Sequence, residues 1–160
     1  MTIKVGDRLP DSKFTVMGKE GPEAVSSAEL LKGKKVILFA VPGAFTPTCS
    51  EQHLPGFVGL TDAFKAKGAD LIACTAVNDV FVLNAWAKGS GAEEITMLAD
   101  GNADFAKALG LDVDLAPFGL GVRSQRYAMI VNDGVVEYLA IEDSTPQHIK
   151  ATAEKVLASF

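Results

Sequence analysis

The stretch over residues 35–50 constrains the fold of this 160-residue chain more than any other part of the sequence. Residues 35–40 form an apolar, β-branched run, which predicts a buried strand. Pro42 and Gly43 then predict a turn, and apolar residues recur at helical spacing as far as about Lys67. A strand, a turn and a helix are therefore expected in that order.

The remaining segments predict a single α/β domain over residues 1–160, with a central mixed sheet flanked by helices. Strands are expected over residues 13–17, 70–77 and 94–99, and helices after Ser26 or Ser27, after Asn78-Asp79 and after residues 100–102. Residues 110–121 are expected to be irregular. This alternation of strands and helices is that of a thioredoxin-like fold.

The C-terminal third predicts a hairpin and a last helix. Two apolar runs flank Asn132-Asp133-Gly134, a sequence suited to a turn that needs positive φ. The last helix is expected to carry Pro146 in its first turn. Its predicted buried positions are Ile149, Ala153, Val156 and Leu157.

Composition and charge exclude several classes of protein. The formal net charge of −5 disfavours binding to nucleic acid. The first residues lack the apolar core of a signal peptide, and the longest apolar run is too short to cross a bilayer, so we expect no membrane association. Two cysteines make no disulfide framework, which favours a reducing, cytoplasmic location.

Cys49 is the residue with the clearest chemical potential. If Thr46 is the N-cap and Pro47 the first helical residue, Cys49 lies in the first turn of the helix. Free N–H groups and the helix dipole favour an anion there, and a thiol at such a position is often a reactive thiolate. The alternative is a small buried hydrophobic residue, since free cysteine is commonly buried.

The sequence motif Pro42-x-x-x-Thr46-x-x-Cys49 resembles the active-site signature of peroxiredoxins. The residues around it, from Gly43 to Ser50 and from His53 to Phe57, resemble the type II (five-type, atypical) peroxiredoxins. The similarity continues at residues 77–86, at residues 97–101 and at residues 126–131. It therefore covers almost the whole chain.

This resemblance implies a thioredoxin-like fold and a thiol-dependent peroxidase. Cys49 would attack hydrogen peroxide or an alkyl hydroperoxide and become sulfenic acid. Thr46, Arg126 and Pro42 would be its catalytic partners: a hydroxyl for sulfur and peroxide, a guanidinium near the sulfur, and a shield over it. No cofactor and no metal are implied.

Each of these residues also has a plainer interpretation. Thr46 suits a helix N-cap, Pro42 suits a turn, and Arg126 suits a solvated strand edge, with Arg123 as its competitor. His53 lies four residues after Cys49, on the same face of the helix, and we favour a structural role for it. Cys49, His53, Cys74 and His148 have no zinc-site spacing.

Cys74 lies within an apolar strand, which predicts a buried, inert thiol. The resemblance offers a second possibility, a resolving thiol, but a disulfide with Cys49 would require the helix to unwind or the strand to become exposed. We therefore expect an external thiol to recycle Cys49: glutathione with glutaredoxin, or thioredoxin.

Other apolar and polar residues predict packing and assembly. Asp79 is expected to cap a helix whose Phe81 and Trp86 belong to the core. Phe45, Leu120 and residues 117–119 are expected to form a homodimer interface near the active site, as the family generally uses.

Two further functions compete with the peroxidase. One is a redox-sensing or chaperone-like binding protein in which oxidation of Cys49 is the signal. The other is cysteine-dependent hydrolysis, for which His53 would be the base but no orienting acid is evident.

Overall fold

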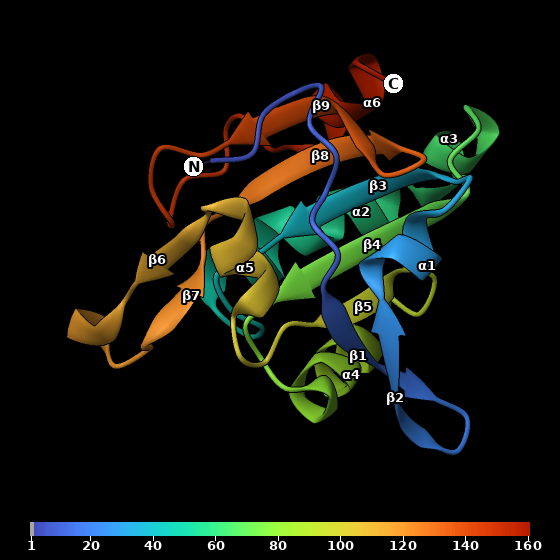
Figure 1. Ribbon diagram of the computed structural model, residues 1–160. Helices are drawn as coiled ribbons and strands as arrows, with labels where there is room; N and C mark the ends of the chain where they lie inside the picture. The colour runs from blue at the N-terminus through green and yellow to red at the C-terminus, as the bar shows by residue number, and fades with distance from the viewer. Residues whose placement is uncertain (1) are drawn as a thin grey trace.

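The computed structural model describes residues 2–160 and has a seven-stranded mixed sheet at its centre (Figure 1). The three strands in the middle of the sheet are parallel, and the strands outside them are antiparallel to their neighbours. In spatial order the strands are β2 (Gly21–Ser26), β1 (Lys13–Gly18), β5 (Thr96–Ala99), β4 (Leu71–Ala76), β3 (Lys35–Ala40), β8 (Tyr127–Asn132) and β9 (Val135–Ile141).

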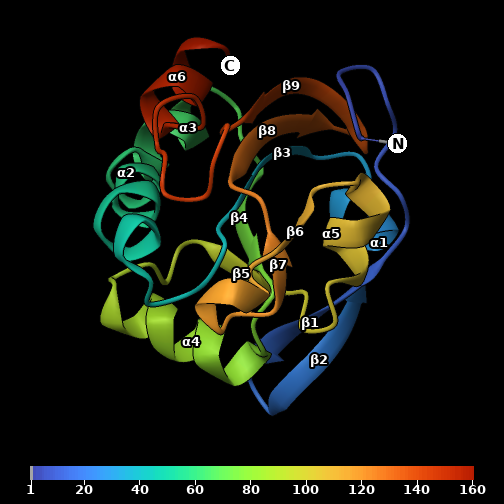
Figure 2. The same ribbon diagram turned by 90° about the vertical axis from the view of Figure 1, so that its left-hand side faces the viewer.

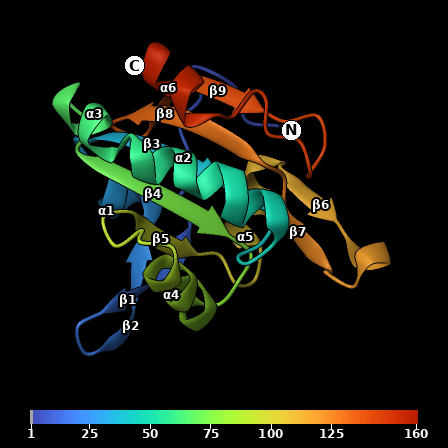
Figure 3. The same cartoon turned by 180° about the vertical axis from the view of Figure 1, so that it is seen from behind.

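Helices cover both faces of the sheet, as expected for an α/β fold (Figure 2). One face packs against α2 (Leu54–Gly59), α3 (Thr61–Ala66), α4 (Val80–Gly89) and α6 (Ala153–Ala158). The other packs against α1 (Ser27–Leu31) and α5 (Asp104–Leu109). Seen from behind, α2 runs along β3 and β4 (Figure 3). None of the helices within residues 2–160 is long and apolar enough to span a bilayer.

Strand β3 shows why its sequence is apolar at every position after Lys35. Ile37 and Phe39 point into the core beneath α2, whereas Val36 and Leu38 point into the core beneath α1 and α5. A parallel strand buried on both faces has no solvent side that would need polar residues.

The local signals for turns and caps are confirmed at several positions. Ser26 accepts the Glu29 N–H at its hydroxyl (3.1 Å) and caps α1. In the hairpin, Asp133 and Gly134 have φ of 48° and 82°, as a type I′ turn between β8 and β9 requires.

The segment expected to be irregular contains a two-stranded arm. Its strands, β6 (Asp112–Asp114) and β7 (Val122–Ser124), pair around the short helix η2 (Ala116–Phe118). The arm extends away from the main sheet (Figures 1 and 3). Strands of this length are too short to show an alternating pattern in the sequence.

The prediction for the last helix is wrong over its first half. Residues 143–152 form a loop, and α6 begins only at Ala153, where the Thr152 hydroxyl caps it (3.3 Å to the Lys155 N–H). Ile149, predicted to be buried, is 59 % exposed. Ala153 and Val156 are buried as predicted, and Leu157 is half-buried.

Candidate active site

The turn after β3 is held by contacts from two neighbouring elements. Asn78, just after β4, accepts the Ala44 N–H at Oδ1 (3.0 Å). Arg123, in β7, donates from Nη1 to the Pro42 carbonyl oxygen (3.3 Å). Phe45 has φ of 66°, a left-handed conformation that is uncommon for a residue other than glycine. The turn therefore has a shape fixed by its surroundings.

The helix begins at Pro47 as predicted, but the Thr46 side chain does not cap it. The Thr46 hydroxyl donates instead to the Gly43 carbonyl oxygen (2.7 Å), which the tight turn brings within reach. A hydroxyl has a single proton, so the turn uses its donor capacity and leaves the oxygen lone pairs free to accept. The structure therefore does not support the plainer interpretation of Thr46 as a helix N-cap.

Cys49 begins a π-helical stretch, η1 (Cys49–His53), that continues into α2. The Leu54 N–H donates to the Cys49 carbonyl oxygen, five residues back, and Pro55 follows with no N–H of its own. The chain thus makes a π-turn ahead of the proline, a feature frequent at functional sites.

Arg126, just before β8, is buried beside Cys49. Its Nη2 donates to the Cys49 Sγ (3.1 Å), and its Nε and Nη2 donate to the Thr145 carbonyl oxygen (3.2 and 3.1 Å). No ion pair among residues 2–160 includes Arg126. The predicted approach of Arg126 to Cys49 is confirmed, and its positive charge faces the sulfur.

His53 supports the guanidinium from within η1. Its Nδ1 lies 3.0 Å from Arg126 Nη1, and its Nε2 lies 3.0 Å from the Ala151 carbonyl oxygen. A guanidinium only donates, so Nδ1 accepts and Nε2 carries the proton. Burial, followed by the charges of Arg126 and His148, lowers the pKa of His53 well below its usual value. His53 is therefore neutral at pH 7.

The sulfur of Cys49 combines complete burial with a permanent cation as hydrogen-bond donor. A neighbouring guanidinium favours thiolate over thiol, and thiolate is the nucleophilic form. Since Cys49 has no exposed surface, an electrophile reaches the sulfur only when the surrounding segment moves. The site is suited to attack by one sulfur on a small electrophile.

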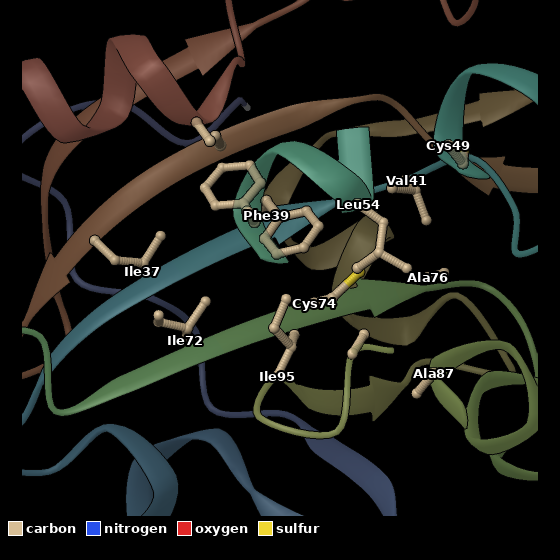
Figure 4. Packing of buried hydrophobic residues seen from close by; sticks show 14 of the residues in the cluster. Ile37, Phe39, Val41, Cys49, Leu54, Ile72, Cys74, Ala76, Ala87 and Ile95 are labelled. Atoms are coloured by element: carbon tan, nitrogen blue, oxygen red, sulfur yellow. The ribbon is translucent and has the colours of Figure 1, made fainter. Parts of the chain in front are cut away.

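Cys74 lies in β4 and is fully buried, as predicted. Figure 4 shows it among apolar side chains that include Phe39, Leu54 and Ile95. Burial raises the pKa of the Cys74 thiol well above its usual value; the charge of Cys49 adds to this, and Arg126 opposes it. Both cysteines are free, and Cys74 is a protonated thiol at neutral pH.

Helix α4 is tied to the site through Trp86, whose Nε1 donates to the Ser50 hydroxyl (3.0 Å). Asp79 caps α4 by accepting the Val82 N–H (2.8 Å), as predicted. Phe81, predicted to be in the core, is 64 % exposed. It lies in the first turn of α4, on the side away from the sheet, so that prediction is wrong.

The exposed apolar residues near the site lie on the turn and the arm. Phe45, Phe118 and Val122 are all exposed. Arg123 joins the two segments, because it donates to the Leu120 carbonyl oxygen (2.9 Å) as well as to that of Pro42. These three exposed residues are called the apolar patch below.

Sequence reasoning missed two supports of the site. Asn78 carried the signal of a helix cap, yet its side chain holds the active-site turn. The carbonyl oxygen of Thr145 holds Arg126, and a backbone group leaves no signal in the sequence.

Comparisons with known proteins agree with this geometry. The Redoxin family model matches residues 4–157. Rice (Oryza sativa subsp. japonica) peroxiredoxin-2E-2, chloroplastic, is 50% identical over 148 residues, which are 89% of this chain and 66% of that protein. Rice peroxiredoxin-2C is 45% identical over 160 residues, 99% of this chain and 98% of that protein.

A solved structure is similar over the whole chain. Reduced Prx3 from Vibrio vulnificus, crystallised in complex with hydrogen peroxide, has a TM-score of 0.95 and 54% identity, and the alignment covers 99% of each chain. The family model and these relatives show that the chain belongs to the peroxiredoxin family, as its resemblance to the type II members predicted.

Proposed function

We propose that this chain is a thiol-dependent peroxidase that reduces hydrogen peroxide and alkyl hydroperoxides, with Cys49 as the peroxidatic cysteine. The observation that carries the proposal is the hydrogen bond of 3.1 Å from Arg126 Nη2 to Cys49 Sγ. The guanidinium has no carboxylate partner among residues 2–160, so its charge is directed at the sulfur and at any oxygen bound beside it.

The first half-reaction oxidises the sulfur. The Cys49 thiolate attacks one peroxide oxygen, an S–O bond forms, and the O–O bond breaks. The leaving hydroxide or alkoxide takes up a proton and departs as water or alcohol. Cys49 becomes sulfenic acid, and the peroxide is reduced.

Arg126, Thr46 and Pro42 have distinct roles in this step. Arg126 stabilises the thiolate and the charge that develops on the peroxide oxygens. The Thr46 hydroxyl donates its proton to Gly43, so it serves as an acceptor for the O–H of the bound peroxide. Pro42 is buried and has no N–H, which suits it to shield the sulfur from water.

Entry of the peroxide requires the site to open. Cys49 is fully buried, whereas Phe45 is exposed and Thr46 and Thr48 are half-buried. The partly exposed segment 45–48 is the part of the site that we expect to move when the peroxide enters. The related Vibrio vulnificus protein was crystallised with hydrogen peroxide, a substrate small enough for this route.

The second half-reaction uses an external thiol: glutathione with glutaredoxin, or thioredoxin. One thiol condenses with the sulfenic acid, releasing water and forming a mixed disulfide. A second thiol then releases Cys49 and leaves as a disulfide. Cys74 is fully buried, and burial raises the pKa of its thiol, so it is poorly suited to resolve Cys49.

We also propose a cytoplasmic location and a homodimer. Two free cysteines favour the reducing environment of the cytoplasm. The apolar patch of Phe45, Phe118 and Val122 lies next to the active-site turn and favours a homodimer interface there.

Steady-state turnover tests the proposed function. With hydrogen peroxide and an excess of thioredoxin, or of glutathione with glutaredoxin, the wild type is expected to consume many equivalents of peroxide. Cys49→Ser is expected to lose turnover, and Cys74→Ser to retain it. A redox sensor would stop after one equivalent, and a hydrolase would turn over esters without reductant; either result in place of peroxide turnover would overturn the proposal.

A further inference from the structure

Glu142, just after β9, is a buried carboxylate that makes no ion pair among residues 2–160. Its Oε2 accepts three consecutive backbone N–H groups, from Ile149 (2.8 Å), Lys150 (2.7 Å) and Ala151 (2.8 Å). Hydrogen bonds to an ionised acceptor are among the stronger ones in proteins. Glu142 thus fixes the end of the loop over residues 143–151, which we call the active-site loop.

The active-site loop supplies the backbone oxygens that hold the groups around Cys49. The Thr145 carbonyl oxygen accepts from Nε and Nη2 of Arg126. The Ala151 carbonyl oxygen accepts from His53, whose Nδ1 in turn accepts from Arg126 Nη1. Apart from its bond to the sulfur, every side-chain hydrogen bond of Arg126 therefore goes to this loop or to a residue that the loop holds.

Glu142 lies where its carboxylate could have competed with the Cys49 sulfur for the Arg126 guanidinium. Its N–H donates to the Arg126 carbonyl oxygen (3.0 Å), so the two residues face each other across the hairpin. A carboxylate paired with the guanidinium would draw it away from Cys49. The carboxylate instead accepts the N–H groups of the active-site loop, and Arg126 remains free to donate to the Cys49 sulfur.

Besides Glu142, which pairs with Arg126 through the backbone, the ionisable groups that Arg126 contacts or whose pKa it shifts are Cys49, His53, His148 and Cys74. The His148 ring lies 4.9 Å from that of His53, and burial together with Arg126 lowers its pKa. Both imidazoles are therefore neutral at pH 7, and the buried acidic side chain next to the active-site loop is that of Glu142.

We propose that Glu142 is a positioning residue for the chemistry of Cys49, because it acts through the active-site loop to hold the Arg126 guanidinium against Sγ. The inference rests on the proposed peroxidase function of the same site. A positioning role and a simple charge effect predict opposite effects of losing Glu142 on the Cys49 thiolate. Removing a nearby negative charge alone would favour the thiolate, whereas loosening the loop would disfavour it.

Two substitutions separate geometry from charge. Glu142→Asp keeps the charge but withdraws the acceptor by one methylene from the three N–H groups. Glu142→Gln removes the charge but keeps an oxygen acceptor at the same length. Glu94→Gln is the matched control, because Glu94 is exposed, lies outside the active-site loop and pairs with Lys65 Nζ (3.4 Å).

The measurement is the pH profile of Cys49 alkylation by iodoacetamide, followed by mass spectrometry in a Cys74→Ser background, well below the melting temperature of each variant. We expect Glu142→Asp to move the midpoint of the profile to higher pH and to slow peroxide reduction about tenfold or more. We expect Glu142→Gln to keep the wild-type midpoint or to move it to lower pH, and Glu94→Gln to keep the wild-type midpoint.

Two results would overturn the proposal: a wild-type midpoint in folded Glu142→Asp, or a shift to higher pH in Glu142→Gln without one in Glu142→Asp. Alkylation involves no peroxide, so it decides the positioning role even if the wild type fails to turn over peroxide. That failure would count against the proposed function alone.

Discussion

A buried arginine with no carboxylate partner is the residue on which the reactivity of Cys49 depends most. Arg126 is 2 % exposed, and its guanidinium is divided among Sγ, the Thr145 carbonyl oxygen and His53. Burying a charge is costly unless the site satisfies its hydrogen bonds, and these contacts do so. The charge of Arg126 is therefore buried at a position where a cation favours the thiolate of Cys49.

Arg126→Ala is expected to slow the alkylation of Cys49 by iodoacetamide at neutral pH, because removing the cation beside the sulfur disfavours the nucleophilic thiolate. Peroxide reduction is expected to fall about 100-fold. In both measurements Arg126→Lys is expected to lie between the wild type and Arg126→Ala, since an ammonium keeps the charge but loses the fork geometry.

Arg8→Ala is the control for these variants, because Arg8 is exposed and donates to the Asp133 carbonyl oxygen, away from the site. Equal alkylation profiles and equal peroxide rates in Arg126→Ala and Arg8→Ala would remove Arg126 from the mechanism.

His53 and His148 make the stability depend on pH. The pKa of each is lowered in the folded state, first by burial and then by Arg126. The unfolded chain takes up these protons near pH 6.5, so it binds more protons than the folded chain between that pH and the folded-state pKa. Stability is therefore full above about pH 6.5 and falls as the pH decreases, by at most about 1.4 kcal/mol per pH unit for the buried His53 and by less for the partly exposed His148, whose charge water screens.

Urea denaturation at several pH values between about 7.5 and 5 measures this dependence. His53→Gln is a suitable comparison, because its amide oxygen can accept from Arg126 and its amide nitrogen can donate to the Ala151 carbonyl oxygen. We expect a shallower loss of stability in His53→Gln. A slope identical to that of the wild type would assign the dependence to other groups.

The residues that touch the sulfur could be predicted from the sequence better than the residues that hold them. Cys49 and Arg126 lie in motifs with a chemical reason for each position. For Thr46 the sequence left an N-cap open as the plainer interpretation, and only the folded turn shows that its hydroxyl donates to the Gly43 carbonyl oxygen. Glu142 carries no motif, and its role depends on a loop conformation that only the folded chain has.

The turn between β3 and η1 is the element that determines the shape of the site. A Cβ added at Gly43 would lie 2.7 Å from Arg123 Nη1 and 3.2 Å from Thr46 Cγ2. Gly43→Ala must therefore displace Arg123 from the Pro42 carbonyl oxygen or move Thr46. We expect a loss of about 1–3 kcal/mol in the free energy of unfolding and a slower reaction with peroxide.

Gly59→Ala is the matched control, because Gly59 lies in α2 with open space around the added methyl group. Alanine in a helix is expected to raise stability by up to about 1 kcal/mol and to leave the peroxide rate unchanged. Thermal melting and stopped-flow peroxide kinetics measure both. A peroxide rate in Gly43→Ala equal to that in Gly59→Ala would show that the turn tolerates a side chain.

Elements with strong local signals were predictable, and elements defined by long-range contacts were not. The hairpin of β8 and β9 follows from the Asp133-Gly134 turn, and β3 follows from its apolar run. The arm of β6 and β7 consists of three-residue strands, and the first half of the predicted last helix is a loop held by Glu142. In both segments distant contacts outweigh local propensity.

Assembly is a property of the whole molecule, and we expect it to involve the apolar patch. In the patch, Phe118 is 77 % exposed and Phe45 is 62 % exposed, on segments that Arg123 links. Phe118→Glu places a charge in the patch and is expected to convert the proposed homodimer to monomer.

Val5→Glu is the control for this variant, because Val5 is exposed on the N-terminal segment outside the patch. Sedimentation over micromolar concentrations measures both variants. A monomeric wild type, or a dimer that survives Phe118→Glu, would contradict an interface at this patch.

The fold of the whole molecule could be predicted because the resemblance covers nearly the whole chain, and the order of strands and helices agrees with it. Access to the site could not be predicted in the same way. Sequence position placed Cys49 at a helix start, but burial of its sulfur depends on how the turn, η1 and the active-site loop pack together.

The most direct test is to treat the reduced wild-type protein with one equivalent of hydrogen peroxide in the presence of dimedone, a reagent that captures sulfenic acid, and to map the modified peptide by mass spectrometry. The account predicts one dimedone adduct on Cys49, none on Cys74, and loss of the adduct in Arg126→Ala at the same exposure time. An adduct on Cys74, or peroxide left unconsumed with both thiols intact, would contradict it.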